Sequence, residues 1–480
     1  MPVPSARLKS LAILGVAAAL TWAAAAPAQA PTPSVRLVGP VGTVELPRFG
    51  SRVPLDVGTW VAATGGDFEL RVARPDYDSP VDIVQVDSVT RAVLRDLPDD
   101  VLNGWRGLKG FVRVIVTDPA GARAASKRFT FCPGGFERQR VDDSGPEEPR
   151  YPQSCGSFSP FTKGMVWGID GGWATPALGG GEFGSATLRL APGRYTFTVR
   201  INSRYVDLLE IPAEDAEVTF PVRVRRGGGF LARRAETVAA GGARSADVPD
   251  VADPDPETLP DLVALPPWSL QAFSRRGRDF LAFAATPWNA GPAPLVVEGF
   301  RRPGEEVMDA YQYFRDAGGD VVGRAEVGDM RFHPHPAHAH WHFLQFASFT
   351  LHDAADLELV RSRKQAFCLA PTDPIDTTVE RAEWSPWGGL GTSCGGRSAL
   401  WVREVLQAGW GDTYFQSVPG QSWDVTTLAN GWYYARIAVN PLGTLYETDM
   451  SNNVESRLVL LGGRPGARWA AAAPWHGIEE

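Results

Sequence analysis

The sequence predicts an all-β protein whose sheets are mainly antiparallel. Its apolar runs are short, they alternate with polar residues, and they are rich in Val, Thr, Phe and Tyr. The 51 glycines and 40 prolines supply many turns between these runs, and long helical patterns are scarce. Because 480 residues exceed what one hydrophobic core accommodates, we expect several β-rich modules.

Residues 1–30 have the features of a signal peptide. Arg7 and Lys9 precede an apolar run over residues 11–26, and small residues follow up to Ala30. A cleaved signal predicts a secreted protein without a membrane span, whereas an uncleaved anchor is the alternative, for which the run is short and rich in alanine. The formal net charge of −8 disfavours nucleic acid as a partner.

Two β-rich modules are expected after the signal. Residues 31–135 contain runs of alternating polar and apolar residues that turn-rich segments separate, which is typical of an immunoglobulin-like β-sandwich. Residues 136–225 are expected to form a second β-rich module. The aromatic, glycine-rich segment 167–173 is interpreted as core, with a carbohydrate-binding face as the alternative. The expected strands are Ser34–Val38, Phe68–Val72, Phe111–Val116, Ser126–Phe131, Ser185–Leu190 and Arg194–Ile201.

A third structured region is expected at residues 259–462. It follows residues 226–258, which lack apolar periodicity and are predicted to be a flexible linker, and it precedes a C-terminal tail at 463–480. Its expected strands are Leu295–Phe300, Trp341–Leu351, Trp401–Glu404, Trp423–Thr427 and Trp432–Asn440.

The chain has four cysteines, an even number that suits two disulfides in an exported protein. Their separation along the chain favours Cys132 with Cys155 and Cys368 with Cys394. The other two ways of pairing them stay open at this point.

Histidines are concentrated in one segment of the third region. If this segment is extended, His338, His340 and His342 point to the same side. A flat strand would separate the first and third Cα atoms by roughly 13 Å, so a twist or bulge is needed for all three to bind one metal ion. Of the seven histidines in the chain, five lie within residues 332–343: His333, His335, His338, His340 and His342.

Three imidazoles with open positions favour copper or zinc. No carboxylate follows at a spacing that suits non-haem iron, and the thiols are better explained as disulfides. The alternative is a histidine-rich surface strand without a specific metal. His333 and His335 lie among prolines, where exposed loop positions are expected, and His335 alternatively supports the metal-binding histidines.

Six segments of the third region carry further motifs. One of them has a lysine four residues before a cysteine, and another contains Asp-Thr-Tyr. The segments are Leu259–Val263, Arg363–Leu369, Gly409–Tyr414, Gln421–Thr426, Gly431–Pro441 and Glu447–Val454. In order and spacing they resemble the catalytic domain of the lysyl oxidase family, although the chain has fewer cysteines than the animal members have in this domain.

The resemblance implies which residues bind the cofactors. It places copper on His338, His340 and His342, and it implies that Lys364 and Tyr414 are crosslinked into lysine tyrosylquinone. Copper then replaces zinc in the interpretation, because oxidation of the phenol gives the metal a redox task. The lysine must lose its proton before it adds to the ring, which burial or a nearby cation would assist.

The implied activity is oxidation of primary amines to aldehydes with O2, releasing ammonia and H2O2. The substrate is either a lysine side chain in a protein or a small amine. Asp412, two residues before Tyr414, is a candidate for the base that removes the substrate proton or for a residue that orients a ligand histidine. The alternative for Asp412 is an ordinary turn residue, and the alternative for the whole chain is a non-catalytic copper-binding adhesion or matrix module.

Overall fold

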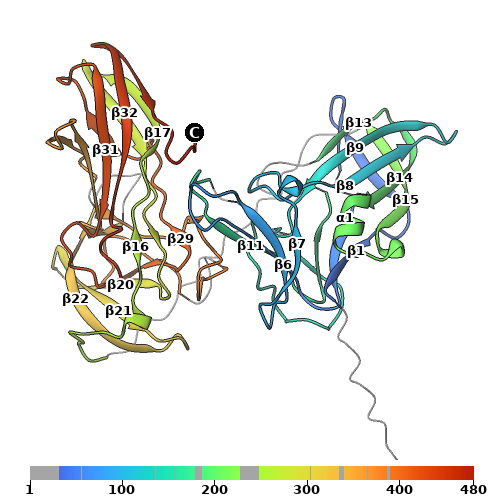
Figure 1. Cartoon of the computed structure of the whole chain (residues 1–480), viewed down its shortest axis with the longest axis horizontal. Coiled ribbons are helices and arrows are strands. Elements are labelled where there is room, and N and C mark those ends of the chain that lie inside the picture. The colour runs from blue at the N-terminus through green and yellow to red at the C-terminus, as the bar shows by residue number, and fades with distance from the viewer. Residues whose placement is uncertain are drawn as a thin grey trace, which may run out of the picture.

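The computed structural model describes residues 32–479 except 56, 136, 157, 179–185, 227–247, 303, 334–339, 365 and 386–389. Within these residues the chain is almost entirely β, as the sequence predicts, and the strand pairs are antiparallel apart from β2 with β15. An N-terminal body and a C-terminal body lie side by side (Figure 1). No helix in the described part is long and apolar enough to cross a membrane.

The N-terminal body contains strands β1 to β15 in four described sheets, with strand orders β1-β4-β12-β10, β11-β5-β6-β7, β13-β3 and β2-β15-β14-β8-β9. A short helix, α1 (Ser203–Leu208), starts where the Asn202 side chain accepts the Arg204 N–H. The strands are β1 (Ser34–Val38), β2 (Val44–Arg48), β3 (Arg52–Pro54), β4 (Trp60–Thr64), β5 (Phe68–Ala73), β6 (Asp82–Val86), β7 (Val93–Leu97), β8 (Leu108–Thr117), β9 (Arg123–Phe131), β10 (Gln139–Arg140), β11 (Gly164–Ile169), β12 (Trp173–Pro176), β13 (Thr187–Arg189), β14 (Gly193–Ile201) and β15 (Glu217–Arg226), with 3-10 turns at η1 (Asp99–Val101) and η2 (Ala213–Asp215).

The two expected N-terminal modules share these sheets. Strand β11 pairs with β5 over its whole length, β14 pairs with β8, and β15 pairs with β2. One buried apolar cluster accordingly runs from Val35 to Val224. Residues 34–226 therefore have one common core and not a separate core on each side of residue 135, because each half supplies strands that cover the apolar faces of the other.

The aromatic segment 167–173 belongs to this core. Trp167 is fully buried, and its indole N–H donates to the Cys155 carbonyl oxygen at 2.8 Å. The interpretation of Trp167 as core is thus confirmed. Cys155 itself is bonded to Cys132 with a Cα–Cα distance of 5.7 Å.

The C-terminal body contains strands β16 to β33, again in four described sheets. Their strand orders are β16-β19-β29-β27, β17-β18-β30, β26-β23-β22-β21-β20-β28 and β25-β24-β31-β32-β33. The strands are β16 (Leu262–Val263), β17 (Trp268–Arg275), β18 (Arg278–Ala284), β19 (Trp288–Asn289), β20 (Leu295–Phe300), β21 (Val307–Arg315), β22 (Val321–Phe332), β23 (Trp341–Leu344), β24 (Ala347–His352), β25 (Glu358–Arg361), β26 (Ala366–Phe367), β27 (Asp373–Pro374), β28 (Trp401–Leu406), β29 (Trp410–Gly411), β30 (Ser422–Asp424), β31 (Gly431–Val439), β32 (Val454–Arg464) and β33 (Ala467–Ala472), preceded by the 3-10 turn η3 (Pro256–Thr258).

The strand expected at 341–351 is two strands that lie in different sheets. Gln345 has a φ of 61°, a left-handed conformation that ends β23 before β24 begins. Strand β23 joins the six-stranded sheet and β24 joins the five-stranded sheet. A core that includes Phe343, Phe346 and Phe349 packs at this junction.

Two further expectations concern the end of the chain and the second disulfide. Residues 467–472 of the expected tail form β33, which extends the five-stranded sheet beside β32. Cys368 is bonded to Cys394 with a Cα–Cα distance of 6.0 Å. Both predicted disulfides are therefore confirmed.

Candidate active site

The histidine segment connects two neighbouring strands of the six-stranded sheet. Strands β22 and β23 pair with Phe332 opposite Trp341, so the chain between them turns back at one end of the sheet. The His340 and His342 ring centroids are 4.6 Å apart, and those of His333 and His342 are 5.6 Å apart. The described residues thus bring three imidazoles together.

The predicted ligand set is only partly visible. His340 and His342 are adjacent, whereas His338, like His335, lies outside the described residues. The described part of the chain contains no group of three or more His, Cys, Asp or Glu residues arranged to hold a metal ion. Assignment of copper to His338, His340 and His342 therefore stays a prediction, although neighbouring imidazoles are the donors that copper prefers.

Lys364 and Tyr414 meet although 50 positions separate them in the sequence. The Lys364 Nζ lies 4.5 Å from the centroid of the Tyr414 ring. Tyr414 is held from both sides: its backbone pairs with Ala285, and its Oη accepts the Cys368 N–H at 3.1 Å. Both side chains are buried, with 8% of Lys364 and 9% of Tyr414 exposed. An amine is thereby fixed against a phenol ring inside the protein.

Burial changes the protonation of this pair. It lowers the pKa of Lys364 to about 8, although the nearby Asp412 and Glu404 carboxyls oppose the change. Burial also raises the pKa of Tyr414 well above its ordinary value, and the same two carboxyls add to that rise. The amine can therefore lose its proton near neutral pH while the phenol keeps its own.

The site is electrostatically continuous with the histidines. Burial lowers the pKa of His340, and the charges of Lys364 and His333 lower it further. The neutral form of His340, which is the form that binds metal ions, is therefore favoured. The charge of Lys364 thus acts on His340, which is consistent with a location of the imidazoles near the Lys364–Tyr414 pair.

The sequence of this region matches a known family. Residues 319–464 match the family described as Lysyl oxidase. The match indicates a lysyl oxidase domain within the C-terminal body and does not extend over the rest of the chain. The matched residues include the whole histidine segment, Lys364, Asp412 and Tyr414.

Lysyl oxidase homolog 3B of Danio rerio is 26% identical to the chain over 137 residues. The aligned segment is 28% of this chain and 15% of that relative. The likeness thus concerns one part of each protein. The N-terminal body, residues 34–226, lies outside the residues that match the lysyl oxidase family.

Asp412 is buried, with 2% of its surface exposed. Burial raises the pKa of its carboxyl well above the ordinary value, and Lys364 acts in the opposite direction. After burial, the charge of Asp412 is the largest influence on the pKa of Tyr414. The structure therefore places the predicted carboxyl beside the predicted amine and phenol.

Glu404 is a site residue that the sequence reasoning missed. It is fully buried, and its two oxygens accept the N–H groups of Phe343 at 3.1 Å and Leu369 at 3.0 Å. It thereby ties the histidine strand β23 to the segment that follows Cys368. The signal in the sequence is the charged pair Arg403 and Glu404 inside the otherwise apolar run Trp401–Leu406, where an unexposed carboxyl needs a specific role.

Proposed function

We propose that this chain is a secreted copper- and quinone-dependent amine oxidase. It would convert R-CH2-NH2, O2 and H2O into R-CHO, NH3 and H2O2. The main support is the position of the Lys364 Nζ, 4.5 Å from the centroid of the buried Tyr414 ring. A buried lysine with a lowered pKa whose amine faces a phenol ring is a candidate for chemistry.

The residues present suit the two cofactors of this chemistry. His340 and His342, with His338, would hold copper, and Lys364 and Tyr414 would form lysine tyrosylquinone. Together these groups supply the exchange of electrons between the amine substrate and O2.

The remaining task of the protein is to orient groups and move protons. The Cys368 N–H donates to the Tyr414 Oη, and that Oη donates to the Cys368 carbonyl at 3.2 Å, so the ring is fixed in the plane that faces Lys364. Asp412 would take the proton from the carbon next to the substrate nitrogen. Its raised pKa suits this role, because a base works best when its pKa is near the working pH.

The substrate is a primary amine, and we propose a lysine side chain of another protein. The chain itself carries a net negative charge of −8, which favours approach of a cationic amine. To separate these two substrate classes, H2O2 release is measured with a lysine-rich protein and with small alkyl amines.

The test of the proposed function is peptide mass mapping of the copper-loaded chain. We expect a covalently joined pair of peptides that contain Lys364 and Tyr414, together with a quinone absorbance. Copper-free protein is the control and should give the two separate peptides. Copper binding without a crosslink and without H2O2 release from any primary amine would instead indicate a non-catalytic metal-binding module.

A further inference from the structure

The N-terminal body is joined to the lysyl oxidase domain by strand pairing. Strand β11 lies at the edge of its own sheet, and residues 375–377 of the C-terminal body run beside it. The Lys163 N–H donates to the Ile375 carbonyl at 2.7 Å, and the Thr377 N–H donates to the Gly164 carbonyl at 2.9 Å. The C-terminal body thus adds a strand-like segment to a sheet of the N-terminal body.

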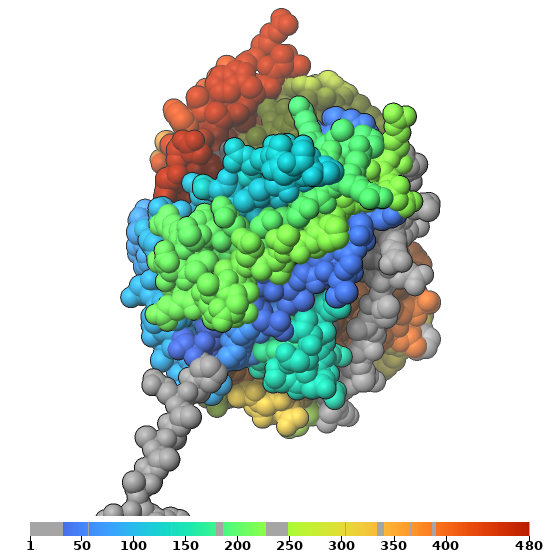
Figure 2. Space-filling view, turned by 90° about the vertical axis from the view of Figure 1, so that its right-hand side faces the viewer, coloured from blue at the N-terminus to red at the C-terminus, as the bar shows by residue number. Residues whose placement is uncertain are grey.

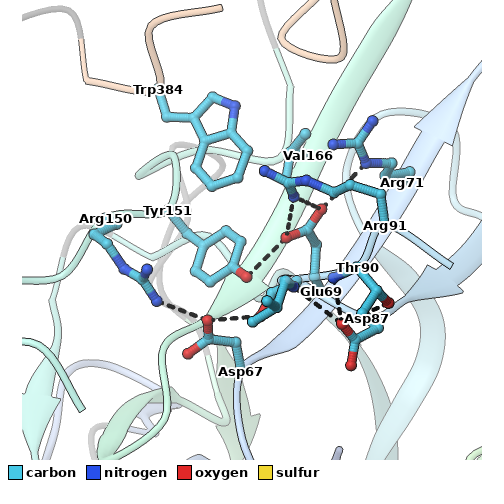
Figure 3. Close-up of polar contacts among 12 residues, drawn as sticks. Asp67, Glu69, Arg71, Asp87, Thr90, Arg91, Arg150, Tyr151, Val166 and Trp384 are labelled. Carbon is cyan, nitrogen blue, oxygen red and sulfur yellow. Dashed lines mark hydrogen bonds and ion pairs between the residues drawn. The ribbon is translucent and has the colours of Figure 1, made fainter. Parts of the chain in front are cut away.

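Side chains on both sides make this contact close. A Cβ atom at Gly164 would lie 2.2 Å from the Asp376 Oδ1 and 2.6 Å from the Thr378 Oγ1, so only glycine fits. Trp384 stacks on Tyr151 with the ring centroids 5.1 Å apart, as Figure 3 shows. In Figure 2, which is turned by 90° from Figure 1, the N-terminal body lies in front of the C-terminal body. The two bodies are therefore packed against each other and not merely tethered.

A chain of hydrogen bonds leads from this contact to the active site. The Phe158 N–H of the N-terminal body donates to the Asp373 Oδ1 at 3.0 Å. Asp373 pairs with Gly411, and the neighbouring Thr372 Oγ1 accepts the Thr413 N–H at 2.6 Å. Thr413 stands between Asp412 and Tyr414. Thr372 and Asp373 consequently connect the N-terminal body to the segment that carries Asp412 and Tyr414.

We propose that the N-terminal body is a fixed part of the active site, and that Thr372 and Asp373 are positioning residues through which it holds Asp412 and Tyr414. Asp373 is 2% exposed, and its buried carboxylate accepts the Phe158 N–H of the docked body as well as the Thr372 hydroxyl of its own body. The effect of this positioning on activity rests on the proposed function. The effect of this positioning on the local order of residues 409–415 does not depend on that function.

The experiment uses the full chain with both contacts removed by Gly164→Val and Trp384→Ala together. We expect faster hydrogen–deuterium exchange in residues 372–378, and a rise of roughly tenfold or more in residues 409–415. Gly431→Val is the matched control, because an added Cβ there meets nothing within 4 Å, and it should exchange as the unmodified chain does. Wild-type exchange at 409–415 in the double variant would overturn the proposal.

A second variant covers the case in which the double variant does not fold. Thr372→Val keeps the shape of the side chain but removes the oxygen that accepts the Thr413 N–H. We expect faster exchange at 409–415 and a fall in kcat of up to about a hundredfold with KM little changed, and Thr372→Ser should restore both. The positioning role would be contradicted if Thr372→Ser did not restore exchange and kcat, or if Thr372→Val exchanged at 409–415 as the unmodified chain does. If the unmodified chain oxidises no amine, the proposed function fails, while the exchange data still decide this inference.

Discussion

Each body of the protein buries a tyrosine beside carboxyl groups, and the two sites differ in their cations. In the N-terminal body the Tyr151 Oη donates to the Glu69 carboxylate at 2.9 Å, and Arg71 and Arg91 form ion pairs with it at 3.1 and 3.0 Å (Figure 3). In the C-terminal body Tyr414 lies beside Asp412 and Glu404, where the nearby cation is Lys364.

The choice of cation would separate the structural site of the N-terminal body from the proposed reactive site of the C-terminal body. A guanidinium keeps its proton at any ordinary pH, so Arg71 and Arg91 compensate the buried charge of Glu69 permanently. An amine loses its proton when burial is strong enough, and burial lowers the pKa of Lys364 to about 8. The guanidiniums of Arg71 and Arg91 lie at partly exposed positions, 29% and 51% exposed, whereas the Lys364 amine is buried, so only the lysine is expected to lose its proton.

The largest effect is expected when this difference is removed with Lys364→Arg. Arginine cannot supply a neutral amine to the Tyr414 ring, so the cofactor should not form and oxidation of primary amines should fall below detection. Tyr414→Phe should have the same result, because it removes the phenol that is to be oxidised. H2O2 release measures activity, and circular dichroism checks the fold. Retention of wild-type turnover by either variant would contradict the assignment.

A smaller loss is expected from Asp412→Asn, which keeps the shape of the side chain and removes its function as a base. We expect kcat/KM to fall by about 10² to 10⁴, the usual contribution of a general base. Asp424→Asn is a suitable control, since Asp424 forms an ion pair with Arg278. A rate within roughly threefold of wild type would exclude Asp412 as the base and leave it a supporting residue.

The rate of cofactor formation should depend on pH in a defined direction. Below a pKa of about 8 the Lys364 amine is protonated and cannot add to the ring, so the rate should rise about tenfold per pH unit below 8 and level off above it. The growth of quinone absorbance after copper addition, followed from pH 6 to 10, measures this. A flat profile between pH 6 and 8 would show that loss of the lysine proton does not limit the reaction.

Much of the fold was predictable from the alternation of polar and apolar residues, because a strand with one buried face has an apolar residue at every second position. The strand expected at Leu295–Phe300 has the same bounds in the structure, and that at Trp432–Asn440 is shifted by one residue. Pairing between distant strands was not predictable in this way. The parallel contact of β15 with β2 joins residues about 180 positions apart, and nothing local in either strand specifies it.

The proposed site was predicted from short motifs that carry chemistry. Lys364, Asp412 and Tyr414 were found because their spacing resembles a family, and the structure shows the geometry that the spacing alone does not contain. Glu404 and Thr372 were not found, since their roles depend on which backbone N–H groups face them in the folded chain. Such contacts are tertiary and leave only a weak trace in the sequence.

The smallest effect on catalysis is expected from Tyr151→Phe, the same change as Tyr414→Phe made in the other body. The phenyl ring would keep its stacking on Trp384, so docking of the two bodies should persist. Glu69 would lose one donor but keep Arg71 and Arg91, so the free energy of unfolding should fall by only about 1 kcal/mol. Urea unfolding measures the loss, and amine oxidation per folded molecule should stay within about twofold of wild type. If Tyr151→Phe instead abolished oxidation as Tyr414→Phe should, both tyrosines would be needed for the reaction, and the separation of a structural from a reactive site would be wrong.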